Sequence, residues 1–174
     1  MIAALNQAPV LLIAALGFSA LGDMLLAREN DRGFLSGMAA FFTAHIAYAI
    51  LFTNYLPPGG VSKFQVVASI ILILLSAAIY RYLRAKLGAF RVPVGLYTVA
   101  IAVMGIAATG LPFAKSFGLA LLGAGLFMAS DIMLAIEKFR PPDHNKARRY
   151  MPYLVWALYW FAQVLILLGI LWSI

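Results

Sequence analysis

Apolar residues fill six long stretches of the chain, separated by short segments that hold charged residues, proline or glycine. Each stretch has about 19 to 23 residues, the length of a helix that crosses the hydrocarbon core of a bilayer. Stretches this long exceed a barrel strand, and every backbone group inside a bilayer must be paired, so the pattern predicts helices. We expect an all-α, polytopic transmembrane bundle with about six spans: Pro9–Ala27, Phe34–Leu56, Phe64–Leu83, Val92–Leu111, Phe117–Ile136 and Tyr150–Trp172.

Composition supports a membrane protein. The 174 residues are 64% hydrophobic and 11% charged, a balance that excludes a soluble domain of this size. The segments between spans are too short to fold separately, so residues 1–174 form one predicted transmembrane domain. Residues 1–8 hold no Lys or Arg, so we expect the first span to be retained and not cleaved as a signal. The absence of cysteine excludes disulfides, thiolate metal sites and cysteine nucleophiles.

Basic residues gather at alternate connections. Eleven of the 13 Lys and Arg residues flank the first, third and fifth connections, whereas Lys63 and Lys115 lie at the others. The positive-inside rule then predicts that both termini lie outside and that the odd-numbered loops are cytoplasmic. The net charge of +7 is thus explained by topology. Because these residues fringe apolar spans and form no separate basic module, we expect no nucleic-acid partner.

A weak internal repeat links the two ends of the chain. The segment Gly22–Glu29 aligns with Ser130–Glu137 and keeps Asp, Leu, Ala and Glu in register. The helices that follow also resemble one another around His45 and Gln163. We predict parallel repeats formed by spans 1–2 and 5–6, which would place a site at their interface.

Asp23 and Asp131 are the acidic residues inside the predicted spans. A charged carboxylate in mid-membrane costs about 2.5 to 3.5 kcal/mol on insertion scales, so such residues normally face the bundle interior. At 1.5 Å per residue, Asp23 and Asp131 lie about 7 Å and 9 Å from the inner ends of their spans. A structural alternative is that each caps a helix or pairs with an Arg such as Arg28. We favour a shared site in which one carboxyl group is an acid and the other a base or charge stabiliser.

Other polar residues could complete this site, although packing or interfacial roles are the alternative for each. The candidate supporting residues are Ser19, His45, Tyr48, Tyr97, Ser130, Tyr159 and Gln163. The two serines belong to no G-x-S-x-G turn and pair with no visible base, so serine catalysis is weakly supported. One intramembrane histidine with two aspartates makes a poor zinc site, and we expect no metal.

In chain order, the pattern that these residues form is Ser19…Gly22-Asp23…Leu26, Phe42…His45…Tyr48, Tyr97 with Met104, Phe127…Ser130-Asp131…Leu134, and Tyr159…Ala162-Gln163…Ile166. From about residue 11 to 170 the chain resembles the YhhN-type lysoplasmalogenase family of multi-pass membrane proteins. Members of that family usually have further helices before the Gly-Asp helix, and their early Lys-Pro segment has no counterpart here. Whether that difference alters activity is left open.

The resemblance implies a membrane hydrolase that cleaves the vinyl ether bond of lysoplasmalogens, giving a fatty aldehyde and a glycerophospho-ethanolamine or glycerophospho-choline. It implies that Asp23 and Asp131 are catalytic, without deciding which is the acid, that no cofactor is needed, and that the partners are a lysophospholipid and the bilayer. We expect a bacterial inner membrane location and leave homo-oligomer formation open. The alternative functions are a proton- or cation-coupled transporter or channel and a non-catalytic lipid-binding membrane protein.

Overall fold

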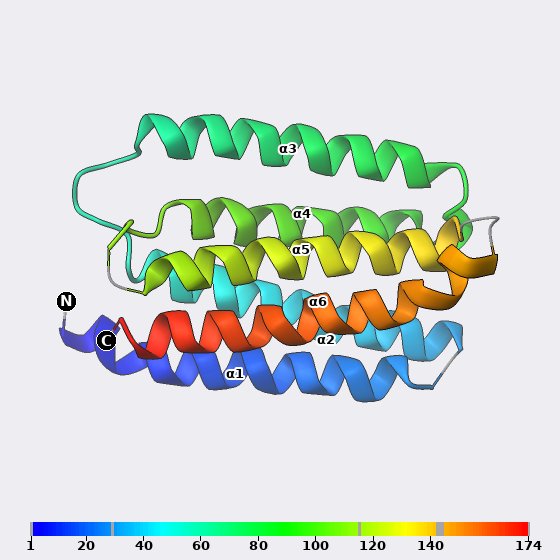
Figure 1. The fold of residues 1–174 in the computed structure, drawn as a ribbon, viewed down its shortest axis with the longest axis horizontal. Helices are drawn as coiled ribbons and strands as arrows, with labels where there is room; N and C mark the ends of the chain where they lie inside the picture. The colour runs from blue at the N-terminus through cyan, green and yellow to red at the C-terminus, as the bar shows by residue number, and fades with distance from the viewer. Residues whose placement is uncertain (1, 29, 115, 142–144, 174) are drawn as a thin grey trace.

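The computed structural model describes residues 2–28, 30–114, 116–141 and 145–173, and the side chains of these residues apart from 2–9 and 145–147. The described segments contain helices and no strand, which confirms the all-α prediction. The elements are α1 (Ile2–Leu26), α2 (Asp31–Thr53), α3 (Lys63–Arg84), the 3₁₀ helix η1 (Gly88–Phe90), α4 (Arg91–Thr109), α5 (Phe117–Phe139) and α6 (Asn145–Leu171), shown in Figure 1.

Helix lengths agree with an integral membrane protein. Five described helical stretches are long and apolar enough to cross a bilayer: Asp31–Thr53, Lys63–Arg84, Gly88–Thr109, Phe117–Phe139 and Arg148–Leu171. Of α1, the part with described side chains, Val10–Leu26, is apolar as well. The helices extend beyond the predicted spans: α1 begins at Ile2, before Pro9, and α6 begins at Asn145, in polar sequence before Tyr150. Pro152 lies inside α6.

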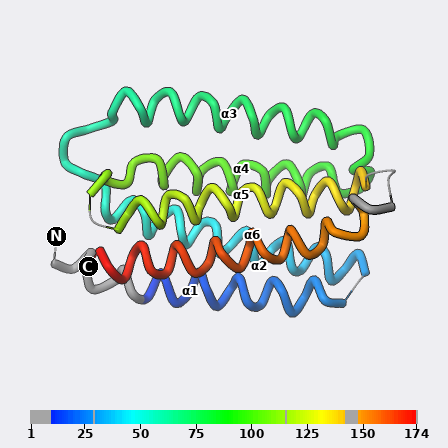
Figure 2. Tube along the Cα trace, viewed as in Figure 1, coloured from blue at the N-terminus to red at the C-terminus, as the bar shows by residue number. Residues whose placement is uncertain are grey.

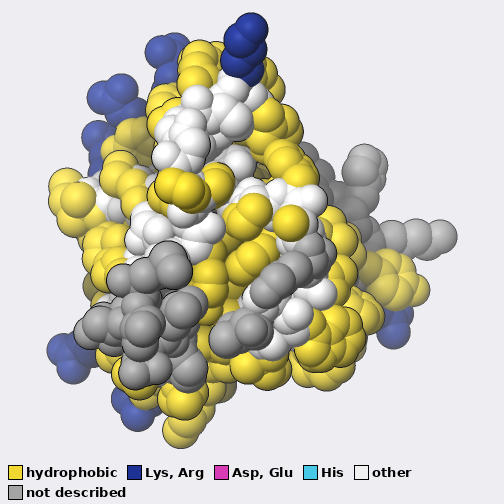
Figure 3. Space-filling view, turned by 90° about the vertical axis from the view of Figure 1, so that its left-hand side faces the viewer, with side chains coloured by type: hydrophobic (Ala, Val, Ile, Leu, Met, Phe, Trp, Pro, Cys, Tyr) yellow, Lys and Arg dark blue, Asp and Glu magenta, His cyan; other side chains and the backbone are white. Residues whose placement is uncertain are grey.

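Alternate connections lie at opposite ends of the bundle. The α1–α2, α3–α4 and α5–α6 connections share one end, and the α2–α3 and α4–α5 connections lie at the other end together with both chain ends (Figure 1). The three connections that are rich in Lys and Arg therefore lie at the same end of the bundle. Seen from the opposite end, the molecule shows mainly hydrophobic side chains and backbone, and Lys and Arg appear only at the outline of the view (Figure 3).

The α1–α2 turn brings these two helices close together. Asn30 caps α2, its Oδ1 accepting a hydrogen bond from the Gly33 amide at 2.7 Å. A Cβ at Gly33 would lie 2.8 Å from Cβ of Arg28 and from the Leu25 carbonyl oxygen, so only glycine fits. The tight turn holds the last two turns of α1, which carry Asp23, against the first half of α2.

Helix α3 stands apart from the other five helices, and the trace shows it as an outlying layer next to α4 (Figures 1 and 2). Only 6% of the residues in its apolar spanning stretch are buried inside the protein, against 50% for the spanning stretch of α2. Its exposed face is aliphatic, as expected of a lipid-facing surface: Val66, Val67, Ile70, Ile71, Ile73, Leu74 and Leu75.

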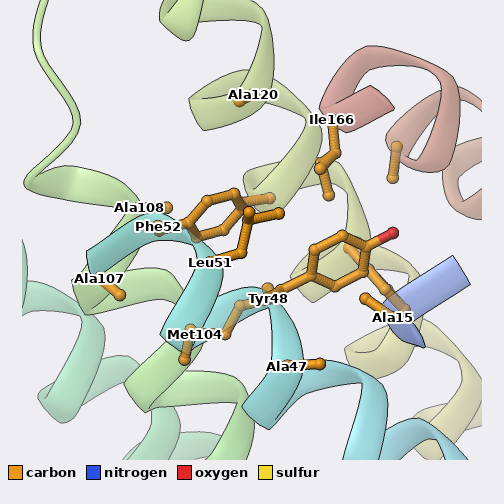
Figure 4. Packing of buried hydrophobic residues seen from close by; sticks show 14 of the residues in the cluster. Ala15, Ala47, Tyr48, Leu51, Phe52, Met104, Ala107, Ala108, Ala120 and Ile166 are labelled. Atoms are coloured by element: carbon orange, nitrogen blue, oxygen red, sulfur yellow. The ribbon is translucent and has the colours of Figure 1, made fainter. Parts of the chain in front are cut away.

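The core lies among the remaining helices. Tyr48, Leu51 and Phe52 of α2 are fully buried and pack with Met104 of α4 and Ile166 of α6 (Figure 4). Alanines from several helices fill the space between these large side chains, and small residues are what allow helix backbones to approach in a membrane. Rigid packing of this kind fixes the rotation of each helix, and that rotation decides which polar side chains meet.

Candidate functional site

Asp131 lies at the centre of the polar residues. It is 6% exposed and is reached by side chains from two other helices. The Tyr97 hydroxyl of α4 donates a hydrogen bond to Asp131 Oδ2 at 3.0 Å. His45 Nε2 of α2 lies 3.1 Å from the same oxygen, close enough for an ion pair although not aligned as a hydrogen bond. Three helices therefore meet at one carboxylate oxygen.

The other His45 nitrogen fixes the number of protons in this pair. His45 Nδ1 lies 2.7 Å from the Phe41 carbonyl oxygen, which can only accept, so Nδ1 carries a hydrogen. In a neutral imidazole, Nε2 is then an acceptor that faces the Asp131 oxygen, itself an acceptor when ionised. A proton on Nε2 or on the carboxyl group would make the contact between them favourable. His45 and Asp131 are therefore placed so that one proton can pass between them.

Asp23 occupies a different environment. It is exposed, and its Oδ2 accepts a hydrogen bond from the Tyr159 hydroxyl of α6 at 2.8 Å. Gln163 is one turn beyond Tyr159 on the same face of α6. Its Oε1 accepts a hydrogen bond from the buried Tyr48 hydroxyl of α2. Polar groups thus extend from Asp23 along α6 toward the middle of the bundle.

Aromatic rings separate the two polar groups. The fully buried Phe127 has its ring centroid 4.6 Å from that of His45 and 5.4 Å from that of Tyr159. The Phe41 ring packs edge to face against Phe127 at 6.2 Å and Tyr159 at 5.7 Å. These rings help to shield the fully buried His45 from water, which strengthens its electrostatic interaction with Asp131.

Both aspartates line one cavity of about 240 Å³, which we call the site cavity. Its walls come from α1, α2, α5 and α6, and the residues are Asp23, Leu26, Phe41, Ser130, Asp131, Leu134, Glu137, Pro152, Val155, Trp156 and Tyr159. The structure thus places both aspartates on the wall of one cavity, and their catalytic role stays a prediction. The cavity continues through Leu26, Leu134 and Glu137 into a more polar groove that contains Lys138 and Arg148, at the basic end of the bundle.

The two serines have different surroundings. Ser130 donates a hydrogen bond to the Val155 carbonyl oxygen at 3.0 Å, a bond that ties α5 to α6 at the cavity wall. Ser19 is buried, and its Oγ has no hydrogen-bond partner among the described residues. It does not line the site cavity. Among the described side chains, no three His, Asp or Glu residues converge as ligands for a metal.

Comparison with known sequences agrees with the residue pattern. The YhhN family matches residues 1–170. The chain belongs to the YhhN family. The family that the sequence resembles is thereby confirmed.

Two relatives of this YhhN protein are lysoplasmalogenase TMEM86A of Bos taurus, 31% identical over 166 residues, and lysoplasmalogenase TMEM86A of Homo sapiens, 30% identical over 166 residues. Each alignment covers 91% of this chain and 64% of the relative, so the chain spans less than two thirds of the relatives' length. No solved structure matches the chain significantly.

Sequence reasoning omitted several residues that form this site in the YhhN protein. Phe41 was not named, and Phe127 was named in the family pattern but not as a supporting residue. Phe41 lies one helical turn before His45 and Phe127 one turn before Asp131, and this i to i+4 spacing was the available signal. Glu137 was interpreted only as the end of a repeat, yet it lines the site cavity. The repeat between spans 1–2 and 5–6 remains a prediction.

Proposed function

We propose that this YhhN protein is a lysoplasmalogenase that cleaves the vinyl ether bond of a lysophospholipid with water, giving a fatty aldehyde and a glycerophospho-alcohol. The observation that carries the proposal is one cavity with two carboxylates in different environments: Asp131 buried against His45, and Asp23 exposed and held by Tyr159. The relatives' printed names support the same activity.

The first step requires an acid. A proton moves from the His45–Asp131 pair to the vinyl carbon that is not bonded to oxygen, and the positive charge is shared between the other vinyl carbon and the ether oxygen. The 3.1 Å separation of His45 Nε2 and Asp131 Oδ2 supports this role, because a proton on either atom can pass to the other while Asp131 lines the cavity. We assign the acid to this pair, with Tyr97 holding the Asp131 carboxylate in position.

The second step requires a negative charge and a base. Asp23 stabilises the oxocarbenium ion by its negative charge. When the oxygen of a water molecule bonds to the cationic carbon, Asp23 accepts a proton from that water, as in glycoside hydrolysis. The bond between the hemiacetal carbon and the glycerol oxygen then breaks. The glycerol oxygen takes the proton from Asp23, and the hemiacetal hydroxyl returns its proton to the His45–Asp131 pair as the aldehyde forms, which restores both groups. Because the Tyr159 hydroxyl bonds to Oδ2 of Asp23, the other carboxylate oxygen, Oδ1, is left to accept the proton from water.

The polar groove suits the headgroup. Lys138 and Arg148 supply positive charge where the site cavity reaches the basic end of the bundle, and a phosphate is their natural partner. With the positive-inside rule, this end faces the cytoplasm. The substrate would then be drawn from the cytoplasmic leaflet, its phosphate at the interface and its vinyl ether one to two turns deeper.

The test uses purified full-length protein in nanodiscs with two substrates, a lysoplasmalogen and its saturated ether analogue, and follows release of fatty aldehyde. We expect aldehyde from the vinyl ether alone, and its loss in Asp23→Asn and Asp131→Asn. Asp31→Asn is the matched control, since Asp31 is an exposed aspartate paired with Lys138 at 3.4 Å on the surface. Its kcat should equal that of wild type.

Two outcomes would overturn the proposal. The proposal fails if the wild-type protein releases no aldehyde. It also fails if Asp23→Asn and Asp131→Asn release aldehyde as fast as the wild type. Proton or cation flux in proteoliposomes that requires Asp131, without hydrolysis, would favour the transporter alternative.

A further inference from the structure

A second opening of the site lies on the side away from the site cavity, between α2 and α4. Here a groove of about 480 Å³ follows the first halves of both helices, with Leu35, Ala39, Phe42 and Thr43 on α2 and Val92 and Leu96 on α4. Leu96 is 60% exposed, so the groove faces the surroundings of the bundle, which in a membrane are lipid chains.

This groove connects with Asp131. Met38 and Tyr97 line both the groove and a small cavity of about 30 Å³, and Asp131 lies on the wall of that small cavity. The small cavity in turn shares Phe41 and Asp131 with the site cavity. Three spaces thus follow one another through the protein from one lateral face to the other.

The small cavity also borders the polar groove, with which it shares Leu26, Phe34 and Leu134. Toward the basic end, the rings of Phe34, Phe90 and Phe139 pack against one another with centroids 5.5 to 5.7 Å apart. The small cavity itself has room for only one or two water molecules. A phosphate headgroup is too large for this space, whereas an unbranched chain could enter it if Met38, a flexible side chain, and Tyr97 moved aside.

From this continuity we infer that the α2–α4 groove holds the alkyl chain of the lysolipid substrate, and that Met38 and Tyr97 form the gate through which this chain extends past Asp131. The inference rests on the proposed function for the identity of the lipid. The headgroup then lies on the polar side and the chain on the apolar side of the catalytic pair.

The arrangement separates the two products by polarity. Cleavage leaves the aldehyde on the chain that already lies in the α2–α4 groove, from which it diffuses into the bilayer. The glycerophospho-alcohol remains on the side of Lys138 and Arg148 and leaves to water. Because lipid chains are as apolar as the groove, occupancy depends on shape more than on hydrophobic gain. The length of the open groove should therefore determine which alkyl chain lengths the protein accepts.

The first test narrows the groove. Ala39 is exposed within it, so Ala39→Trp fills the space without touching Asp131. We expect kcat/KM for a long-chain lysoplasmalogen to fall roughly tenfold or more, with a short-chain analogue unaffected. Ala77→Trp is the matched control, since Ala77 is an exposed alanine in a groove of about 570 Å³ between α3 and α4. Equal loss for both chain lengths, or no loss for either, would overturn the inference.

The second test does not depend on hydrolysis. A saturated ether lysophospholipid with a diazirine at the end of its chain is photolysed with the full-length protein, and labelled residues are mapped by mass spectrometry. We expect label on Leu35, Phe42 or Leu96. Label confined to the α3–α4 groove, or to Trp156 on the opposite face, contradicts the inference. Labelling as expected from a protein that releases no aldehyde would reject the proposed function and keep the chain-binding groove.

Discussion

His45 Nε2 lies 3.1 Å from Asp131 Oδ2, while His45 Nδ1 donates to the Phe41 carbonyl oxygen at 2.7 Å. The two contacts hold the imidazole across α2 and α5, with both nitrogens engaged. Asp131 is thus paired with a group that can share its proton, whereas Asp23 has only the Tyr159 hydroxyl as a described partner. The unequal surroundings of the two carboxylates are the basis of the predictions that follow.

The His45–Asp131 pair should behave as one unit. We expect His45→Gln and Asp131→Asn each to lower kcat for vinyl ether cleavage roughly 100-fold or more, because either change removes the shared proton. The double variant should be no slower than the slower single variant. Aldehyde release at saturating substrate measures this. Multiplicative losses would show that the two residues act separately.

Tyr159→Phe should weaken the role of Asp23. A hydrogen bond to a charged group is worth about 1.5 to 3 kcal/mol, so we expect turnover to fall about 10- to 100-fold. Tyr153→Phe serves as control, because Tyr153 is on the same helix and 70% exposed. Both variants should unfold at the wild-type temperature in detergent. We expect the Tyr159→Phe protein to have a lower turnover and the unfolding temperature of the wild type. Wild-type turnover in this variant would show that Tyr159 has no role in catalysis.

Arg148→Gln should act on substrate binding. Since Arg148 lies in the polar groove, we expect KM to rise about fivefold at low salt with kcat unchanged. The difference from wild type should shrink as salt is added, because screening weakens the attraction for phosphate. Lys63→Gln, a basic residue at the opposite end of the bundle, should leave KM as it is. A change in kcat alone would argue against a headgroup contact.

Gly123 should matter for stability. A Cβ added there would lie 2.8 Å from the Ala162 carbonyl oxygen and 2.9 Å from the Ile166 amide nitrogen, so α5 and α6 would have to separate. We expect Gly123→Val to destabilise the protein by about 1–3 kcal/mol in thermal unfolding. Gly125→Val is the matched control on the same helix, since no neighbouring atom lies within 4 Å of its added Cβ. Equal unfolding temperatures would contradict the packing described for α5 and α6.

Orientation can be tested by single cysteines, because the chain has none of its own. Gly59 and Ala89 are exposed and lie in connections at opposite ends of the bundle. We expect an impermeant maleimide to label Gly59→Cys in sealed cells and Ala89→Cys only after permeabilisation. The reverse pattern would place the basic connections outside.

The sequence predicted the helices well because span length and backbone pairing leave few alternatives in a bilayer. It also selected Asp23 and Asp131, since an acidic residue in an apolar span is costly without a purpose. The partners of these residues were harder to predict. That Tyr97 reaches Asp131 and Tyr159 reaches Asp23 depends on how each helix is rotated about its axis, and packing of many apolar side chains sets that rotation.

The aromatic wall shows why the remainder of the site was not predicted. Phe41 and Phe127 are ordinary residues for membrane helices, and nothing in their type distinguishes them from the exposed Phe42 or Phe161. The full length of the helices was not predicted for a related reason. Apolar length indicates the part of a helix that lies within the bilayer, whereas α6 begins in polar sequence before its apolar span.

The outlying position of α3 divides the molecule into two parts with different freedom to change. The site cavity draws its lining from α1, α2, α5 and α6, and the adjoining groove from α2 and α4, so α3 supplies no residue to either. Exchanges among aliphatic residues on its outer face alter how the protein fits its lipid surroundings and leave the aspartates undisturbed. Helix α3 is therefore where such a protein can adapt to membranes of different thickness or composition while its chemistry stays the same.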